Sequence, residues 1–248
     1  REIEFTILEN KPITDDICKM VLECSAGEHG ITAPGQFINI KIDGLFLRRP
    51  ISICDWTETT VTVIYKVVGK GTELLKTYEP GRQLNALSAL GNGFAPARAG
   101  QRPLLIGGGV GVPPLYGLYR NLIEAGARPT VILGFNTERE VFYKEEFEKL
   151  GAEVLVATAD GSMGQKGFVT DVLRNIKEPA TFFYTCGPEP MLKALDKALA
   201  EGLEGEMSFE ERMGCGFGAC MGCSCETRYG AKRICKDGPV LERSEILW

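Results

Sequence analysis

Five of the nine cysteines of this chain lie between positions 215 and 235, in a segment with little periodic hydrophobic pattern. A segment of about forty residues rarely builds a sufficient hydrophobic core of its own and commonly needs a metal centre to hold it together. A disulfide framework would instead spread its cysteines over a small secreted domain. The cysteine distribution therefore predicts a small metal-binding domain at residues 206–248.

The spacing of these cysteines narrows the type of metal centre. Four of them read C-x4-C-x2-C-x11-C, at Cys215, Cys220, Cys223 and Cys235. The first three have the spacing of a plant-type [2Fe–2S] loop. Glycines between them allow backbone N–H groups to approach the sulfur atoms. A structural zinc site is the alternative, although such sites usually contain two C-x2-C pairs and this segment has one. Cys225 is an alternative to Cys223 as the third ligand.

The rest of the chain divides into two patterns. Residues 1–98 contain short runs rich in β-branched and aromatic residues, separated by turn residues, which predicts a small antiparallel barrel with one helix near Thr72–Tyr78. Residues 99–205 alternate between strand and helix patterns, which predicts a parallel sheet covered by helices on both faces. The expected fold is therefore multi-domain: an all-β barrel, an α/β parallel-sheet domain and a small C-terminal domain.

Two turns of the α/β region are candidates for nucleotide binding. A glycine-rich turn follows the first strand and precedes a helix, where a pyrophosphate can approach the backbone. A second turn follows the last strand of the same sheet, at the edge where open parallel sheets bind their ligands. The residues concerned are Gly107, Gly108, Gly109 and Gly111 in the first turn, and Cys186, Gly187 and Pro188 in the second. A buried structural role is the alternative for Cys186.

Composition excludes several classes of protein. The net charge of -5 gives no basic surface for nucleic acid, and no run of about 20 apolar residues is present to span a membrane. The first residues lack the basic and apolar regions of a secretory signal, so we expect a cytoplasmic protein. His29 is the only histidine, and we expect it on the surface of a loop; a Cys₂His₂ zinc finger, a Rieske centre and a histidine-based triad do not fit.

These motifs together resemble the ferredoxin reductase superfamily over nearly the whole chain. Family members bind flavin through R-x-[YFI]-[ST], matched by Arg49–Ser52, and bind a nicotinamide nucleotide through G-G-G-x-G and C-G-P. The segments RRPISI, YKVVGKGT, FEERMGCGFGACMGCSCET and RICKDGPVLERSEI further resemble the electron-transfer subunits of class 1B dihydroorotate dehydrogenases. The resemblance implies FAD contacts from Arg49, Pro50, Ile51, Ser52, Tyr65, Lys66, Val67, Gly71 and Thr72. It also implies cluster ligation by the four cysteines at the spacing above.

The resemblance also implies a function. Electrons would leave dihydroorotate at an FMN-containing catalytic subunit, pass through the cluster and FAD, and reduce NAD⁺, within a heterotetramer that serves pyrimidine biosynthesis. No residue is assigned as an acid–base catalyst, because the flavin carries the chemistry. NAD is favoured over NADP, since Glu138 and Glu140 would repel a ribose phosphate. Phe217 and Met221 are candidates for an exposed apolar patch at the partner interface.

Two other functions fit the same motifs. One is a reductase component that serves a different oxidoreductase complex, with the same domains and another electron partner. The other is a non-catalytic zinc-binding module on a degenerate reductase fold. Visible absorbance of the purified chain separates a redox protein from a zinc module.

Overall fold

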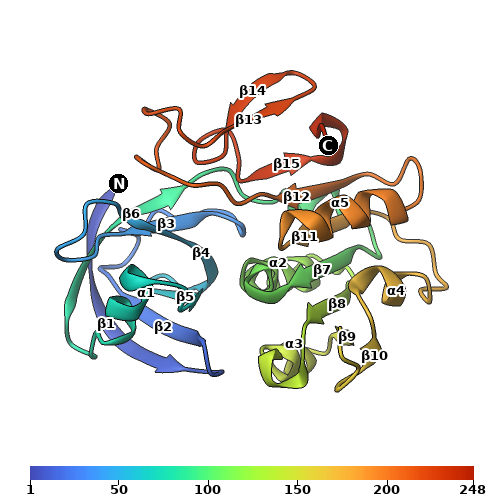
Figure 1. The fold of residues 1–248 in the computed structure, drawn as a ribbon, viewed down its shortest axis with the longest axis horizontal. Coiled ribbons are helices and arrows are strands. Elements are labelled where there is room, and N and C mark those ends of the chain that lie inside the picture. The colour runs from blue at the N-terminus through green and yellow to red at the C-terminus, as the bar shows by residue number, and fades with distance from the viewer.

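The computed structural model describes all 248 residues, as a barrel, an α/β sheet and a C-terminal segment that spans the two (Figure 1). None of its helices has the length and apolar character needed to cross a lipid bilayer. The multi-domain architecture expected from the sequence is confirmed.

The barrel is closed by antiparallel pairing in the order β1-β2-β5-β4-β3-β6. Its elements are β1 (Glu2–Pro12), β2 (Ile17–Glu23), β3 (Phe37–Ile40), β4 (Arg49–Trp56), β5 (Thr60–Lys66), α1 (Lys70–Lys76) and β6 (Gln83–Leu90). Helix α1 begins two residues before the expected start, because Thr72 Oγ1 accepts hydrogen bonds from the N–H groups of Val68 and Gly69, at 2.9 and 3.3 Å.

The second sheet has seven strands in the order β10-β9-β8-β7-β11-β12-β15, all parallel except β15. Its strands are β7 (Leu104–Gly108), β8 (Thr130–Phe135), β9 (Glu153–Thr158), β10 (Gln165–Lys166), β11 (Phe183–Cys186), β12 (Gly205–Ser208) and β15 (Val240–Glu242). Its helices are α2 (Pro113–Glu124), α3 (Lys144–Lys149), α4 (Val169–Leu173) and α5 (Glu189–Ala198).

Helices cover both faces of this sheet, as expected. Leu105 points to the face covered by α2 and α3, whereas its neighbours Leu104 and Ile106 point to the face covered by α4 and α5. Successive strand residues therefore serve two separate cores. Helix α3 begins only at Lys144, because Tyr143, with a φ of 64°, leaves the right-handed helical region just before it.

Helix α2 joins the α/β sheet to the barrel. A Cβ atom added to Gly117 of α2 would lie 2.8 Å from the carbonyl oxygen of Cys54 in β4, so only glycine permits this approach. Beside it, Nη1 of Arg120 donates to both carboxylate oxygens of Asp55, at 2.7 and 2.8 Å. The apolar core is continuous across this interface, and the relative position of barrel and sheet is thereby fixed.

The C-terminal segment packs on both parts. Its cysteine loop, residues 215–235, contains the hairpin of β13 (Ser224–Thr227) and β14 (Gly230–Arg233). Strand β15 then joins the α/β sheet beside β12. Arg243 fastens the end of the chain to α5, because its guanidinium donates to Asp196, Ala200 and Leu203. The expected division after residue 205 stays a prediction, and it falls inside β12.

One expectation about the barrel region is wrong. His29 is buried, with 5% of its surface exposed, rather than on the surface of a loop. Its Nδ1 accepts a hydrogen bond from the N–H of Ile31 at 3.1 Å, and its Nε2 lies 2.8 Å from the carbonyl oxygen of Thr57. Both ring nitrogens are satisfied, so His29 has a structural role in this turn.

Candidate functional site

A cavity of about 360 Å³ lies between the barrel and residues 208–213, at and just after the end of β12. One wall comes from β4, β5 and α1, and the opposite wall from the segment after β12, with Val110 of the glycine-rich turn at its edge. Seven of the nine residues expected to contact FAD line it: Arg49, Pro50, Ile51, Ser52, Tyr65, Lys66 and Thr72. Val67 packs against the barrel core, and Gly71 lies behind Arg49.

The position of Arg49 depends on Gly71. A Cβ atom on Gly71 would overlap the guanidinium of Arg49, so the side chain can lie flat across the start of α1 only because residue 71 is glycine. Nη1 of Arg49 donates to the carbonyl oxygen of Leu47 at 2.6 Å. The remaining N–H groups of this planar fork are free for an anionic group such as a phosphate.

Tyr65 is held in the cavity wall by its hydroxyl. The hydroxyl donates to Asn10 Oδ1 at 2.8 Å, and Asn10 Nδ2 donates in turn to the carbonyl oxygens of Leu75 and Tyr78. Burial raises the pKa of Tyr65 well above its ordinary value, so the phenol stays protonated. This chain of contacts links the cavity wall to the end of α1.

The two turns expected to bind a nucleotide are in contact. A Cβ atom on Gly111 would overlap the carbonyl of Cys186 and would lie 2.6 Å from the nitrogen of Gly187. A Cβ atom on Gly108 would lie 2.5 Å from the sulfur of Met191 in α5. The glycines thus allow the first turn to pack directly on the second, at the carboxyl ends of β7 and β11.

The thiol of Cys186 is itself buried, with 2% of the residue exposed. Burial, with the nearby charge of Glu210, raises the pKa of this thiol to about 12. The side chain is therefore a neutral packing group under the turn. What the turn offers to a ligand is the main chain at Gly187 and Pro188.

The cysteine loop places its sulfur atoms in two pairs. Cys215 N–H donates to the sulfur of Cys220 at 3.4 Å, and Cys220 N–H donates back to the sulfur of Cys215 at 3.4 Å. Cys235 N–H donates to the sulfur of Cys223 at 3.4 Å. Although burial opposes it, hydrogen bonds from the backbone N–H groups of Cys220, Phe217 and Ala219 lower the pKa of Cys215 to about 6.

This arrangement fits a two-iron cluster. A structural zinc ion needs four ligands around one centre. A [2Fe–2S] cluster needs two protein ligands on each of two irons, and two cysteine pairs with backbone N–H donors at their sulfurs are compatible with that need.

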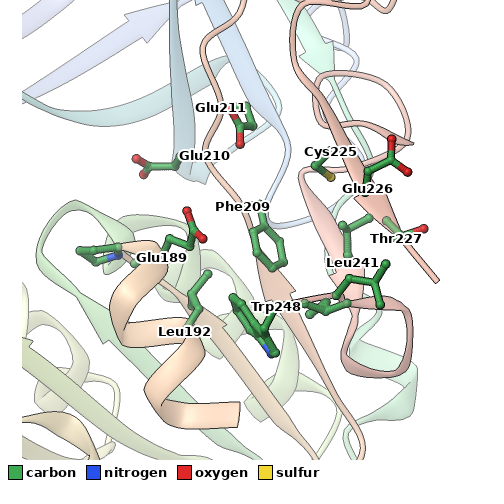
Figure 2. A pocket seen from close by; sticks show the side chains of 14 residues that line it. Glu189, Leu192, Phe209, Glu210, Glu211, Cys225, Glu226, Thr227, Leu241 and Trp248 are labelled. Atoms are coloured by element: carbon green, nitrogen blue, oxygen red, sulfur yellow. The ribbon is translucent and has the colours of Figure 1, made fainter. Parts of the chain in front are cut away.

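Cys225 lies in the wall of a separate cleft of about 370 Å³. Figure 2 shows this cleft between α5, with Glu189 and Leu192, and the hairpin of β13 and β14; Phe209 lies at the centre of the cleft. Burial, with the negative charges of Glu211 and Glu226, raises the pKa of the Cys225 thiol. Cys223, in contrast, is 2% exposed and packs with Cys235, which favours Cys223 as the third ligand.

Residues 209–213 belong to a motif that carries the family resemblance, but the sequence assigned none of them to a site. Phe209, Glu210 and Glu211 line both cavities and separate the barrel site from the cleft beside Pro188. Burial raises the pKa of Glu210 at this junction. The segment follows directly after a strand of the parallel sheet, and that position was the available signal, because ligands bind at this edge.

Family models match two parts of the chain. One, described as the iron-sulfur cluster binding domain of dihydroorotate dehydrogenase B, matches residues 210–247. The other, described as the oxidoreductase NAD-binding domain, matches residues 105–197. Both matches lie where the structure places the cysteine loop and the two glycine-containing turns.

Curated relatives match over the full length. The dihydroorotate dehydrogenase B (NAD(+)) electron transfer subunit of Geobacillus sp. (strain WCH70) is 43% identical, over 100% of this chain and 99% of the relative. The subunit of the same name from Shouchella clausii (strain KSM-K16) is 44% identical, over 98% of this chain and 96% of the relative.

Solved structures show the same fold. The NADH-dependent reduced ferredoxin–NADP oxidoreductase, studied for flavin-based electron bifurcation, superposes with a TM-score of 0.88 at 30% identity, over 98% of this chain and 90% of that one. A ferredoxin NADP⁺ reductase from Neisseria gonorrhoeae with bound FAD and NADP gives a TM-score of 0.69 at 18% identity, over 79% and 89%. The second likeness concerns the fold alone.

Proposed function

The chain belongs to the family of dihydroorotate dehydrogenase B electron transfer subunits, and we propose that it passes electrons from a catalytic FMN subunit, through a [2Fe–2S] cluster and FAD, to NAD⁺. One observation carries the proposal. Residues 208–213 form a wall of the barrel cavity, the nucleotide turns lie beside them, and Cys215 begins the cysteine loop two residues later.

The barrel cavity is the proposed FAD site. Arg49 presents its guanidinium fork to the flavin phosphates, and Gly71 keeps that fork in place. Ser52 and Tyr65 line the same cavity, where they would contact the ring system of a bound flavin. The bound flavin supplies a group that exchanges a hydride with NAD(H) and single electrons with an iron–sulfur centre.

The two turns are the proposed NAD site. Gly109 has a φ of 52°, and no atom lies within 4 Å of the position that a Cβ atom would take there, so its backbone is open to a pyrophosphate. Gly187 and Pro188 position the nicotinamide end of the nucleotide toward the barrel cavity. Glu138 and Glu140 at the end of β8 favour a ribose hydroxyl over a phosphate.

Cys215, Cys220, Cys223 and Cys235 are the proposed cluster ligands. Their loop carries two exposed apolar side chains, Phe217 with 55% and Met221 with 54% of its surface exposed. We propose this face as the contact with the dihydroorotate dehydrogenase catalytic subunit, in a heterotetramer located in the cytoplasm. Apolar exposure around a redox centre is what a partner-binding surface provides.

The test combines a spectrum with a reconstitution. The purified chain should show flavin and iron–sulfur absorbance, with about one FAD and two irons per chain. With a catalytic subunit it should reduce NAD⁺ at the expense of dihydroorotate, and without that subunit it should not oxidise dihydroorotate.

Two results would contradict the proposal. A colourless protein that contains zinc would favour the non-catalytic module. Full NADH-dependent reduction of an unrelated acceptor, with no coupling to a dihydroorotate dehydrogenase, would favour a reductase of another complex.

A further inference from the structure

Strand β3 of the barrel has an outer face that supports the cysteine loop. Ile38 and Ile40 point into the barrel core, and the alternate residues, Phe37 and Asn39, point outward. Phe37 packs in one apolar cluster with Cys223 and Cys235. The loop therefore rests on a strand that lies far from it in the sequence.

Asn39 is the unusual residue on this face. It is 1% exposed, yet its side chain makes no hydrogen bond with the protein, and its Oδ1 atom is fully buried without a partner. Nearly all buried polar side-chain atoms in proteins have partners, and each exception calls for an explanation. The only partner of Asn39 from a side chain is at its main-chain carbonyl oxygen, which accepts from Arg48 at 3.4 Å.

The amide of Asn39 is directed at the cysteine loop. A Cβ atom on Gly216 would overlap Asn39 Nδ2, so the amide nitrogen lies against the main chain between Cys215 and Phe217. Gly216 has a φ of 78°, a conformation that glycine adopts freely. At the same place, the N–H groups of Ala219 and Cys220 donate to the sulfur of Cys215, at 3.2 and 3.4 Å.

We propose that Asn39 is a positioning residue for the iron–sulfur cluster. Its amide packs against the loop at Gly216 and would present an N–H dipole to the negative charge of the cluster and its thiolates. This inference rests on the proposed function, since it requires that the loop carries a cluster. An N–H donor beside the sulfurs favours the reduced, more negative state and raises the reduction potential.

Two variants of the full chain, prepared with its catalytic partner, test the inference. Asn39→Leu keeps the volume and removes the amide, and Asn39→Asp keeps the shape and replaces the donor with a negative charge. Reduction of the cluster is followed by electron paramagnetic resonance during a redox titration. Asn175→Leu is the control, because Asn175 is exposed and its side chain bonds only to Gln165, at the far edge of the α/β sheet.

Asn39→Leu should lower the equilibrium constant for cluster reduction about three- to tenfold. At 59 mV per tenfold for one electron, the potential falls by roughly 30–60 mV. Asn39→Asp should lower the reduction potential further, and Asn175→Leu should leave it unchanged. A potential unchanged in both variants, with full iron content, would overturn the inference.

If a variant loses its cluster, its iron and FAD contents show whether the loop or the barrel is affected. Loss of iron with FAD retained supports a role for Asn39 in holding the loop. Loss of both groups means that Asn39 serves the barrel fold, and the inference is then wrong. If the unaltered chain binds no iron, the proposed function itself fails.

Discussion

The N–H of Asn92 donates to the carbonyl oxygen of Gly238 at 2.6 Å, which ties the end of the barrel to the segment that carries Cys235. On the other side, the N–H of Phe209 donates to the carbonyl oxygen of Pro239 at 2.9 Å. Because Pro239 also lines the barrel cavity, a proposed cluster ligand and the proposed flavin site share one short, doubly anchored segment.

This junction should be sensitive to Gly91→Ala. Gly91 has a φ of 73°, and an added Cβ atom would lie 2.6 Å from Pro239 Cδ and 2.8 Å from the carbonyl oxygen of Gly238. We expect the free energy of unfolding to fall by about 2 kcal/mol or more, with loss of iron. Urea unfolding and iron analysis measure both effects.

Gly81→Ala is the matched control for this variant. Gly81 has a φ of 87°, but nothing lies within 4 Å of an added Cβ atom. It should therefore show the backbone strain alone, about 1–2 kcal/mol. Equal effects of the two variants would mean that the contact with Pro239 is unimportant.

Serine substitution distinguishes the four proposed ligand cysteines of the C-terminal segment from Cys225. Each of Cys215→Ser, Cys220→Ser, Cys223→Ser and Cys235→Ser should abolish or strongly reduce iron–sulfur absorbance, since each removes one thiolate ligand. Cys225→Ser should keep it, because Cys225 faces the other cleft. Iron per chain is the measurement, and a cluster that survives Cys223→Ser but not Cys225→Ser would exchange the two assignments.

Arg49→Lys should weaken FAD binding. Lysine cannot reproduce the planar fork, and the loss of charge-assisted hydrogen bonds predicts a dissociation constant roughly ten- to a hundredfold higher. Arg48→Lys is the control, because Arg48 does not line the cavity and donates instead to Asn85, Glu2 and the carbonyl oxygen of Asn39. Flavin fluorescence on dilution measures release, and similar release from both variants would contradict the assignment.

Glu138→Arg should shift the nucleotide preference toward NADP. The substitution removes a negative charge at the end of β8 and adds a cation that can pair with a ribose phosphate. We expect the ratio of kcat/KM for NADPH over NADH to rise about tenfold or more, as a good charged contact allows. Glu153→Arg, at the opposite end of the sheet, should leave the ratio unchanged.

Glu206 should make stability depend on pH. Its carboxylate is buried in β12, and desolvation raises its pKa above the ordinary 4.5, although the N–H of Ala95 donates to it at 2.9 Å. The native state then holds the proton more tightly than the unfolded state. The free energy of unfolding gained from this tighter proton binding is fully present below pH 4.5 and is lost as pH rises through the raised pKa of Glu206.

Glu206→Gln tests this dependence. The amide keeps an acceptor for Ala95 and carries no charge, so the variant should gain stability relative to the natural chain between about pH 4.5 and pH 7.5. Urea midpoints at the two pH values measure the gain. A constant difference between the two proteins would show that Glu206 does not titrate differently on folding.

Much of the fold could be predicted because its signals are local. Strand runs with turn residues between them predict the barrel, and alternating strand and helix patterns predict the parallel sheet. The predicted start of α1 was less accurate, because it depends on one side chain, the hydroxyl of Thr72 that accepts two backbone hydrogen bonds. The expectation that His29 lies on the surface was wrong for a similar reason, since its burial comes from turn contacts that a polar sequence does not reveal.

The sequence alone determined the chemistry available to this protein. The spacing of four cysteines and the positions of the glycines are fixed within short segments, where local geometry decides what can bind. Only the tertiary structure decided how these segments meet. The outer face of β3 brings Asn39 against Gly216, and residues 208–213 separate two cavities. These contacts join positions far apart in the chain, and they follow from which faces of the barrel and sheet need burial.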